Sequence, residues 1–356
     1  MGYFEVIYVK ISPIPKGDTV DKIVSISLGA LIVSIMIQFL ILYLSCRYHL
    51  FIDPSSSGKP QGFHSEDTPR SGGLAIAIAL LFFLPTPLGW KLLLSLFLAF
   101  LSGIFEDLSL SVKPGTRLVL QLIAAITAVY LIHSVVVYFG FGITVPYFIG
   151  AVISVIAIVG MMNAINFIDG FNGLASGIVL LMLFSFGLVA YRVGNSDALY
   201  IIAILFAALL AFFLFNFPRG KIFLGDGGSY LLGASVAIIG IFLGATYGQV
   251  SPWFILTVLI YPVWEVIFSI YRKLSMGHSP LQPDERHLHM LIYKHITHNN
   301  PLTSLLIIVA VAPFILLPTL YTKASIANFM TTLLFIVCYQ LLYGYLSRKE
   351  ALSKKL

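Results

Sequence analysis

The sequence has 356 residues, of which 59% are hydrophobic and only 10% are charged, and its mean hydropathy is +0.97. This composition excludes a soluble globular domain and predicts an integral membrane protein. The net charge of +6 is the charge expected of cytoplasmic loops that orient membrane helices, so it does not indicate a nucleic-acid partner.

Apolar segments of about 20 residues recur along the chain, whereas alternating ten-residue segments do not. The sequence therefore predicts an all-α polytopic helical bundle rather than a β-barrel. The segment 72–86 is short: about 15 residues reach only ~23 Å across a hydrocarbon core of ~30 Å, so ten spans are the alternative to eleven. The eleven predicted spans are 23–44, 72–86, 88–105, 118–138, 144–164, 173–191, 198–217, 229–247, 252–271, 302–320 and 325–346.

The distribution of basic residues predicts the orientation of these spans. With eleven spans and the N terminus outside, 15 of the 21 Lys and Arg residues fall in the inner connections, as the positive-inside rule requires. The C terminus is then cytoplasmic. We expect a single transmembrane domain, 1–356, whose reactive groups lie in five cytoplasmic connections: 46–72, 105–117, 164–173, 217–229 and 272–301.

Acidic residues gather in the same connections, at the points where apolar spans meet turns that contain Gly or Pro. Glu106, Asp107, Asp169 and Asp226 all have this position. A carboxylate at the bilayer centre costs about 2.5 to 3.5 kcal/mol, which explains why these residues stand at span ends. An interfacial site favours an enzyme over a secondary transporter, since a transporter places its acids near the midplane.

Four polar residues stand three apart in the segment NAINFIDGFNG (163–173): Asn163, Asn166, Asp169 and Asn172. On a helix this spacing places them near one another. Carboxylate and amide oxygens suit Mg²⁺ that is shared with a phosphate. The alternative is that each residue caps a helix end.

The segment KIFLGDGGSYLLG (221–233) places Asp226 and two glycines just before an apolar helix. The N–H groups of Gly227, Gly228 and Ser229 then lie at a helix start, where an anion binds. With Lys221 and Asp226, this pattern predicts a pyrophosphate site.

The adjacent acids Glu106 and Asp107 repel each other, so a nearby cation or a raised pKa is expected. One carboxylate could take a proton from a phosphate or orient it, while Lys113 and Arg117 neutralise its charge. An acid pair at the membrane edge with basic anchors is the alternative.

The motif HLH (287–289) does not predict a zinc site, because His287 and His289 do not share a helix face and no third ligand accompanies them. Together with Arg286 they offer hydrogen-bond donors to a diphosphate. A solvated basic loop is the alternative.

Taken in order, these motifs resemble the polyprenyl-phosphate N-acetylhexosamine-1-phosphate transferase family, nearest the branch that starts O-antigen, common-antigen and similar glycans. Glu106 stands where the family usually has Asp, and Asn172 where many bacterial members have Asp. The motifs that carry the resemblance are PRSGG (69–73), FEDL (105–108), NAINFIDGFNG (163–173), FNFPRGKIFLGDGGS (215–229) and PDERHLH (283–289).

The resemblance implies that Asp226 and Asn166 hold Mg²⁺, with Mn²⁺ as a substitute, against a pyrophosphate, and that Asp107 faces a lipid phosphate as the base. It further implies uracil stacking by Phe223, nucleoside contacts by Gly170 and Asn172, phosphate binding by Arg117, and donor-phosphate contacts by His287 and His289. The same motifs add Glu106 and Asp169 as catalytic residues and Asn163, Lys113, Arg70, Lys221 and Arg286 as substrate-binding residues.

The implied reaction moves a HexNAc-1-phosphate from a UDP-N-acetylhexosamine to undecaprenyl or a similar polyprenyl phosphate and releases UMP. It would be the first membrane step of a cell-surface glycan, on the cytoplasmic face of a bacterial inner membrane. The expected partners are the two substrates, the lipid bilayer and a second copy in a homodimer, without nucleic acid. A phospho-MurNAc-pentapeptide-type transferase, a secondary transporter and an inactive membrane scaffold are the alternatives.

Overall fold

The computed structural model describes residues 17–48, 52–53, 68–108, 112–277, 279 and 286–353, with the backbone alone at 52–53 and 353. In this part of the chain thirteen α-helices account for most residues, and the one sheet is a two-residue antiparallel pair, β1 (Ile52–Asp53) with β2 (Thr68–Pro69). The predicted all-α membrane bundle is confirmed. Its helices are α1 (Gly17–Tyr48), α2 (Gly72–Ala79) with the 3₁₀ turn Leu80–Phe83, α3 (Pro87–Asp107), α4 (Pro114–Ile132), α5 (Tyr147–Ile168), α6 (Leu174–Arg192), α7 (Ser196–Asn216), α8 (Gly225–Thr246), α9 (Pro252–Val258), α10 (Ile260–Ser275), α11 (Leu288–Ile292) with the π turn Tyr293–Thr297, α12 (Asn300–Leu316) with the 3₁₀ turn Leu317–Leu320, and α13 (Ser325–Ser353).

Nine helices among the described residues are long and apolar enough to cross a membrane. The helix Gly72–Phe83 is shorter, in keeping with the short length of the predicted span 72–86. The predicted span 252–271 is broken instead: α9 and α10 meet at an angle of 77°. Pro262 has no N–H to donate to the carbonyl of Val258, so a regular helix cannot continue through the junction. If the bent pair crosses the membrane once, the part of the chain that the structure describes has up to ten spans.

Short polar residues set the starts of several helices. The Thr86 hydroxyl accepts from the N–H of Gly89 at 2.9 Å, and Pro87 follows as the first residue of α3. Asn195 caps α7 in the same way, Ser251 caps α9, and Asn299 caps α12. Each side chain satisfies an N–H that has no partner inside its own helix.

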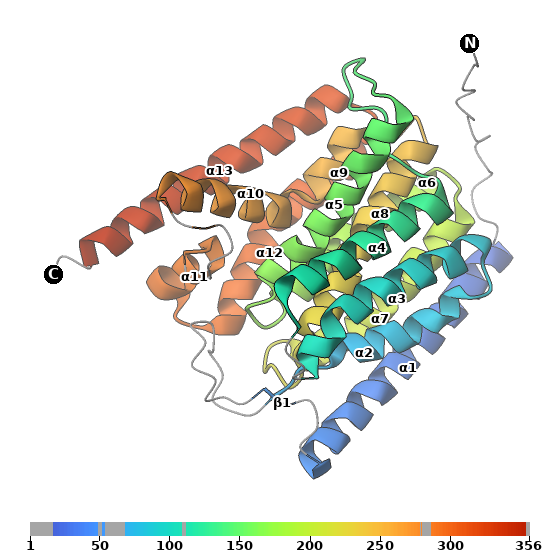
Figure 1. Ribbon diagram of the computed structural model, residues 1–356, viewed down its shortest axis with the longest axis horizontal. Helices are drawn as coiled ribbons and strands as arrows, with labels where there is room; N and C mark the ends of the chain where they lie inside the picture. The colour runs from blue at the N-terminus through green and yellow to red at the C-terminus, as the bar shows by residue number, and fades with distance from the viewer. Residues whose placement is uncertain are drawn as a thin grey trace.

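Helix α8 is the core of the bundle. Its most apolar window is 83% buried, against 22% for α1 and for α13, and it packs on α3 and α5 (Figure 1). A Cβ added to Gly103 of α3 would lie 2.4 Å from the carbonyl carbon of Asp226, and one added to Gly73 would lie 2.3 Å from the Cα of Gly228. Glycine at these positions lets neighbouring backbones touch the first turn of α8.

The ends of the helices that carry the polar motifs meet at one end of the bundle (Figure 1). The segment before α2 lies beside the segment before α8: the N–H of Phe223 donates to the carbonyl of Pro69 at 2.8 Å, and that of Gly72 to the carbonyl of Phe223 at 2.9 Å. This pairing fixes Arg70 next to the start of α8. Helix α10 turns away from α9 and reaches α13.

Candidate active site

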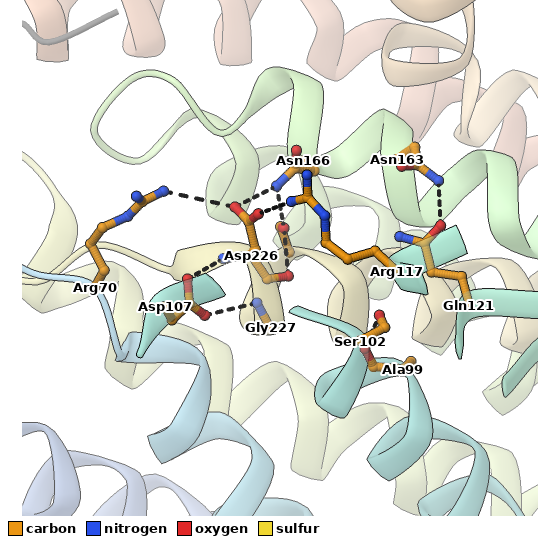
Figure 2. Close-up of polar contacts among 11 residues, drawn as sticks. Arg70, Ala99, Ser102, Asp107, Arg117, Gln121, Asn163, Asn166, Asp226 and Gly227 are labelled. Carbon is orange, nitrogen blue, oxygen red and sulfur yellow. Dashed lines mark hydrogen bonds and ion pairs between the residues drawn. The ribbon is translucent and has the colours of Figure 1, made fainter. Parts of the chain in front are cut away.

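Asp226, in the first turn of α8, is the centre of the polar cluster. Its Oδ2 accepts from Nη1 of Arg117 at 3.0 Å, and its Oδ1 accepts from Nδ2 of Asn166 at 3.1 Å. Nη2 of Arg70 lies 3.7 Å from Oδ1 (Figure 2). The structure thus brings together residues from α4, α5, α8 and the segment before α2, as charge complementarity requires.

Asp107, the last residue of α3, caps α8. Its Oδ1 accepts from the N–H of Asp226 at 2.7 Å, and its Oδ2 accepts from the N–H of Gly227 at 2.9 Å (Figure 2). A carboxylate at a helix start satisfies unpaired N–H groups and interacts favourably with the helix dipole. The prediction that the N–H of Gly227 is open to a pyrophosphate is therefore wrong, because Asp107 already occupies it.

Gly225 makes this cap possible. Its φ is +79°, and a Cβ there would lie 2.6 Å from Oδ2 of Asp107 and 2.7 Å from the carbonyl oxygen of Arg70. Any other residue at this position would combine backbone strain with a clash against the carboxylate.

Glu106, Lys113 and Lys221 flank the cluster without joining it. Glu106 is half-buried, and the two lysines are exposed. Within the described residues their side chains make no hydrogen bond or ion pair, so the structure gives them no fixed partner. Their positions at the rim suit long-range attraction of a charged substrate rather than fixed contacts.

The predicted polar stripe 163–172 runs past the end of α5 at Ile168 and divides into separate contacts. Asn166 also donates to Oγ of Ser229 at 3.0 Å, which ties α5 to α8. Asn163 instead donates to Oε1 of Gln121 on α4 at 2.8 Å. Asn172 is buried in the loop before α6, where its Nδ2 donates to the carbonyl of Pro218 at 3.1 Å. Asn166 alone of these three touches Asp226.

Asp169 follows the last residue of α5. The residue keeps part of its surface, but its carboxyl is surrounded by protein, and this burial raises its pKa well above the ordinary value of 3.8. Arg70 opposes the rise in pKa, while the negative charges of Asp226 and Asp107 add to it. Three carboxyl groups therefore share this site with two guanidinium groups, an arrangement that a further cation would stabilise.

We expect Asp169→Asn to stabilise the protein at neutral pH in the absence of divalent cations. Because the folded-state pKa is raised, the folded protein binds the proton more tightly than the unfolded chain, and stability is lost as pH rises above the unfolded value of about 3.9. The gain in melting temperature, measured in detergent from pH 4 to pH 8, should be largest at pH 8 and vanish towards pH 4. A gain that is independent of pH would contradict this account.

His287 and His289 lie side by side on the start of α11. Their rings are parallel, with centroids 5.4 Å apart. Phe167 and Phe171 contact them edge-on at 5.4 and 5.3 Å, which joins this pair to the end of α5. Burial lowers the pKa of His289 to about 4, so its ring is neutral at pH 7. Its Nδ1 is buried without a hydrogen-bond partner among the described residues.

The remaining predicted residues line the edges of the site. Phe223 is half-buried, and its backbone is held by the strand-like contact with Pro69. A Cβ on Gly170 would lie 3.8 Å from Nε2 of His289, so the loop after α5 approaches the histidines. Arg286 is exposed, and the residues 283–285 of the PDERHLH motif lie outside the described part of the chain.

Sequence reasoning missed several residues that hold this site together. Asn300 accepts from the N–H of Asn172 at 2.8 Å, and Asn216 accepts from the N–H of Gly173 at 2.5 Å. Glu265, an acid inside the predicted span 252–271, contacts His287 at 3.1 Å. A buried Asn or Glu in an apolar segment signals that a partner exists, but sequence spacing does not identify it.

The oxygen atoms of this site fit a Mg²⁺ ion only if the ion also binds a substrate diphosphate. Asp226, Asn166 and Asp169 offer hard oxygen atoms in a region with excess carboxylate, which suits an ion that keeps several waters and shares phosphate oxygens. The described residues contain no group of three His, Cys, Asp or Glu side chains that could hold a metal on their own. The residues therefore fit an ion bound together with a diphosphate and not one held in a closed protein cage.

Residues 90–244, from α3 to α8, match the profile of glycosyl transferase family 4. The undecaprenyl-phosphate alpha-N-acetylglucosaminyl 1-phosphate transferase of Thermotoga maritima is 31% identical over 250 residues, which are 69% of this chain and 74% of the relative. The chain belongs to glycosyl transferase family 4. The resemblance drawn from the five motifs is confirmed.

Other relatives are similar over shorter stretches. A Yersinia pestis protein with the same name as the Thermotoga relative is 31% identical over 205 residues, 55% of each chain. The phospho-N-acetylmuramoyl-pentapeptide-transferase of Streptococcus agalactiae serotype Ia is 40% identical over 146 residues, 39% of this chain. That match spans only 43% of the relative's own length.

Proposed function

We propose that this member of the family transfers a HexNAc-1-phosphate from a UDP-N-acetylhexosamine to a polyprenyl phosphate of the undecaprenyl type. The observation that carries the proposal is the position of Asp226: at the start of the most buried helix, between two arginines and beside Asn166. Such a site can bind a diphosphate through its cations and a metal through its oxygen atoms.

In the proposed reaction an oxygen of the lipid phosphate attacks the β-phosphorus of the donor. The bond between the β-phosphorus and the bridging oxygen breaks, and UMP leaves with that oxygen. Arg117 and Arg70 bind phosphate oxygens and keep the two anionic substrates together. When bound by Asp226 and Asn166, Mg²⁺ would neutralise charge on the diphosphate.

Asp107 and the histidines have different tasks in this proposal. Asp107 holds the first turn of α8, and thereby Asp226, through two backbone hydrogen bonds. Its carboxylate retains lone pairs, so a role as base towards the lipid phosphate stays part of the proposal. His289 lies beside Gly170, and the ring of His287 is parallel to that of His289, so contacts of these histidines with the donor's phosphates stay part of the proposal.

We place this site on the cytoplasmic face of a bacterial inner membrane. The predicted excess of Lys and Arg in the connections at this end of the bundle supports that orientation. The nucleotide sugar would then arrive from water and the prenyl tail from the bilayer. An interfacial site is the one position that both substrates reach.

We expect the purified protein to release UMP from one UDP-HexNAc donor in the presence of undecaprenyl phosphate and Mg²⁺. The donor panel should contain UDP-GlcNAc, other UDP-N-acetylhexosamines and UDP-MurNAc-pentapeptide. EDTA should abolish the release and added Mg²⁺ should restore it, because the donor set is too small to retain the ion alone. Reaction with the pentapeptide donor alone would assign the protein to the other branch, and no reaction with any donor would refute the enzyme proposal.

A further inference from the structure

His287 is held by a helix outside the segment that defines the family match. Glu265 of α10 is 1% exposed, and its Oε1 lies 3.1 Å from Nδ1 of His287 and accepts from the N–H of Leu288 at 3.0 Å. Its Oε2 accepts from the hydroxyl of Tyr339 on α13 at 2.7 Å. One carboxylate therefore joins the C-terminal helix to the histidine.

A second contact fixes the chain on the other side of the histidine. Arg272, on the same helix as Glu265, donates to the carbonyl of Arg286 and to the hydroxyl of Tyr343 at 2.7 Å. Tyr339 and Tyr343 are one turn apart on α13, and their rings are parallel. The backbone before and after His287 is thus anchored to α10, and each anchor is braced by a tyrosine of α13.

This arrangement fixes the orientation of the His287 ring. A carboxylate at Nδ1 favours the proton on that nitrogen and fixes the rotation of the ring. Nε2 lies at the opposite edge of an imidazole, away from Glu265. The hydroxyl of Tyr339 in turn determines how the Glu265 carboxylate is oriented, because it occupies the oxygen that His287 does not use.

We propose that Tyr339 is a positioning residue that acts through Glu265 to orient His287 for contact with the donor's phosphates. This inference rests on the proposed function, which supplies the diphosphate. Helix α13 lies outside residues 90–244, the segment that matches the family. The proposal gives this helix a specific effect on the site, through one hydroxyl, in addition to its packing.

The test uses Tyr339→Phe, which removes one hydroxyl and keeps the ring contacts with Phe268 and Phe335. We expect kcat/KM for the UDP-sugar donor to fall by about tenfold, the effect of losing one charge-assisted hydrogen bond. The KM for the polyprenyl phosphate should not change. Tyr345→Phe is the matched control, because Tyr345 is on the same helix and 64% exposed, and it should behave as wild type.

A double-mutant cycle separates positioning from a general packing role. If Tyr339 acts through His287, then Tyr339→Phe should cost almost nothing in a His287→Ala background, whereas independent effects would add. The cycle with Glu265→Gln should give the same coupling. Additive effects in both cycles, or an unchanged kcat/KM in Tyr339→Phe, would overturn the inference.

The proposed function has a separate readout. Wild-type protein that releases no UMP from any donor refutes the function, whatever the variants do. In that event, calorimetric binding of UDP with Mg²⁺ to the same variants tests the positioning role: weaker binding in Tyr339→Phe but not in Tyr345→Phe would support it, and equal binding would overturn it.

Discussion

Asp226→Asn is expected to lower turnover by about 10³-fold, the size of loss found when one charge-stabilising group is removed from a water-excluded site. The amide keeps the shape of the side chain, so helix α8 should stay in place. What it loses is the negative charge that faces Arg117 and Arg70 and would hold the cation. UMP release, with Mg²⁺ at saturation and protein folding checked by melting temperature, measures the effect.

Asp197→Asn is the matched control for Asp226→Asn. Asp197 is an exposed acid in the first turn of α7. The site lies near the other end of α7, at Asn216. The same loss of one carboxylate there should leave turnover unchanged. Full activity of Asp226→Asn would end its role as a metal ligand, while an equal loss in both variants would point to a general charge effect.

Asp107→Asn is expected to lower both activity and stability, because Asp107 caps α8. An amide can accept one of the two N–H groups of Asp226 and Gly227, but its NH₂ would then face the other. We expect a loss of about 1 kcal/mol in the free energy of unfolding, typical of a lost helix cap. Turnover should fall by about 10²-fold, since small displacements of a reacting group have effects of that size.

The binding of UDP with Mg²⁺ distinguishes the capping role from a role as base alone. A displaced Asp226 should weaken that binding in Asp107→Asn. If Asp107 acted only as a base, binding and melting temperature would remain at the wild-type values while turnover fell. The double variant with Asp226→Asn should be little worse than Asp226→Asn alone, because the cap acts through Asp226.

The sequence predicted the helices well because apolar runs and their polar boundaries are local signals. Every predicted span contains helix in the described residues. The bend between α9 and α10 was missed, since the apolar run continues across it and Pro262 is a weak signal at the start of a helix. Hydropathy indicates that a segment is buried in lipid or protein, but it does not indicate the direction in which the helix axis runs.

The sequence predicted which residues form the candidate site, but it did not predict which of them contact one another. Asn166 and Asp226 were grouped by residue type, and the structure places them 3.1 Å apart. The spacing of three residues grouped Asn163 with Asn166 as a member of the site. In the structure Asn163 pairs instead with Gln121, which lies 42 positions away in the sequence. Asp107 proves to cap a helix, which the sequence analysis did not predict for it, and the helix that it caps begins more than 100 residues later in the chain. Such pairings depend on how helices pack, and that is not encoded in any single segment.

The burial of α8 also determines how the surrounding lipid can act on this protein. Only 22% of the most apolar window is buried in α1 and in α13, whereas 83% is buried in α8. A bilayer that is thinner or thicker than the hydrophobic length of the bundle is accommodated by tilting of its outermost helices. Mismatch would therefore reach the site through the outer helices that contact it: α4, whose Arg117 binds Asp226, and α13, whose Tyr339 hydroxyl donates to Glu265.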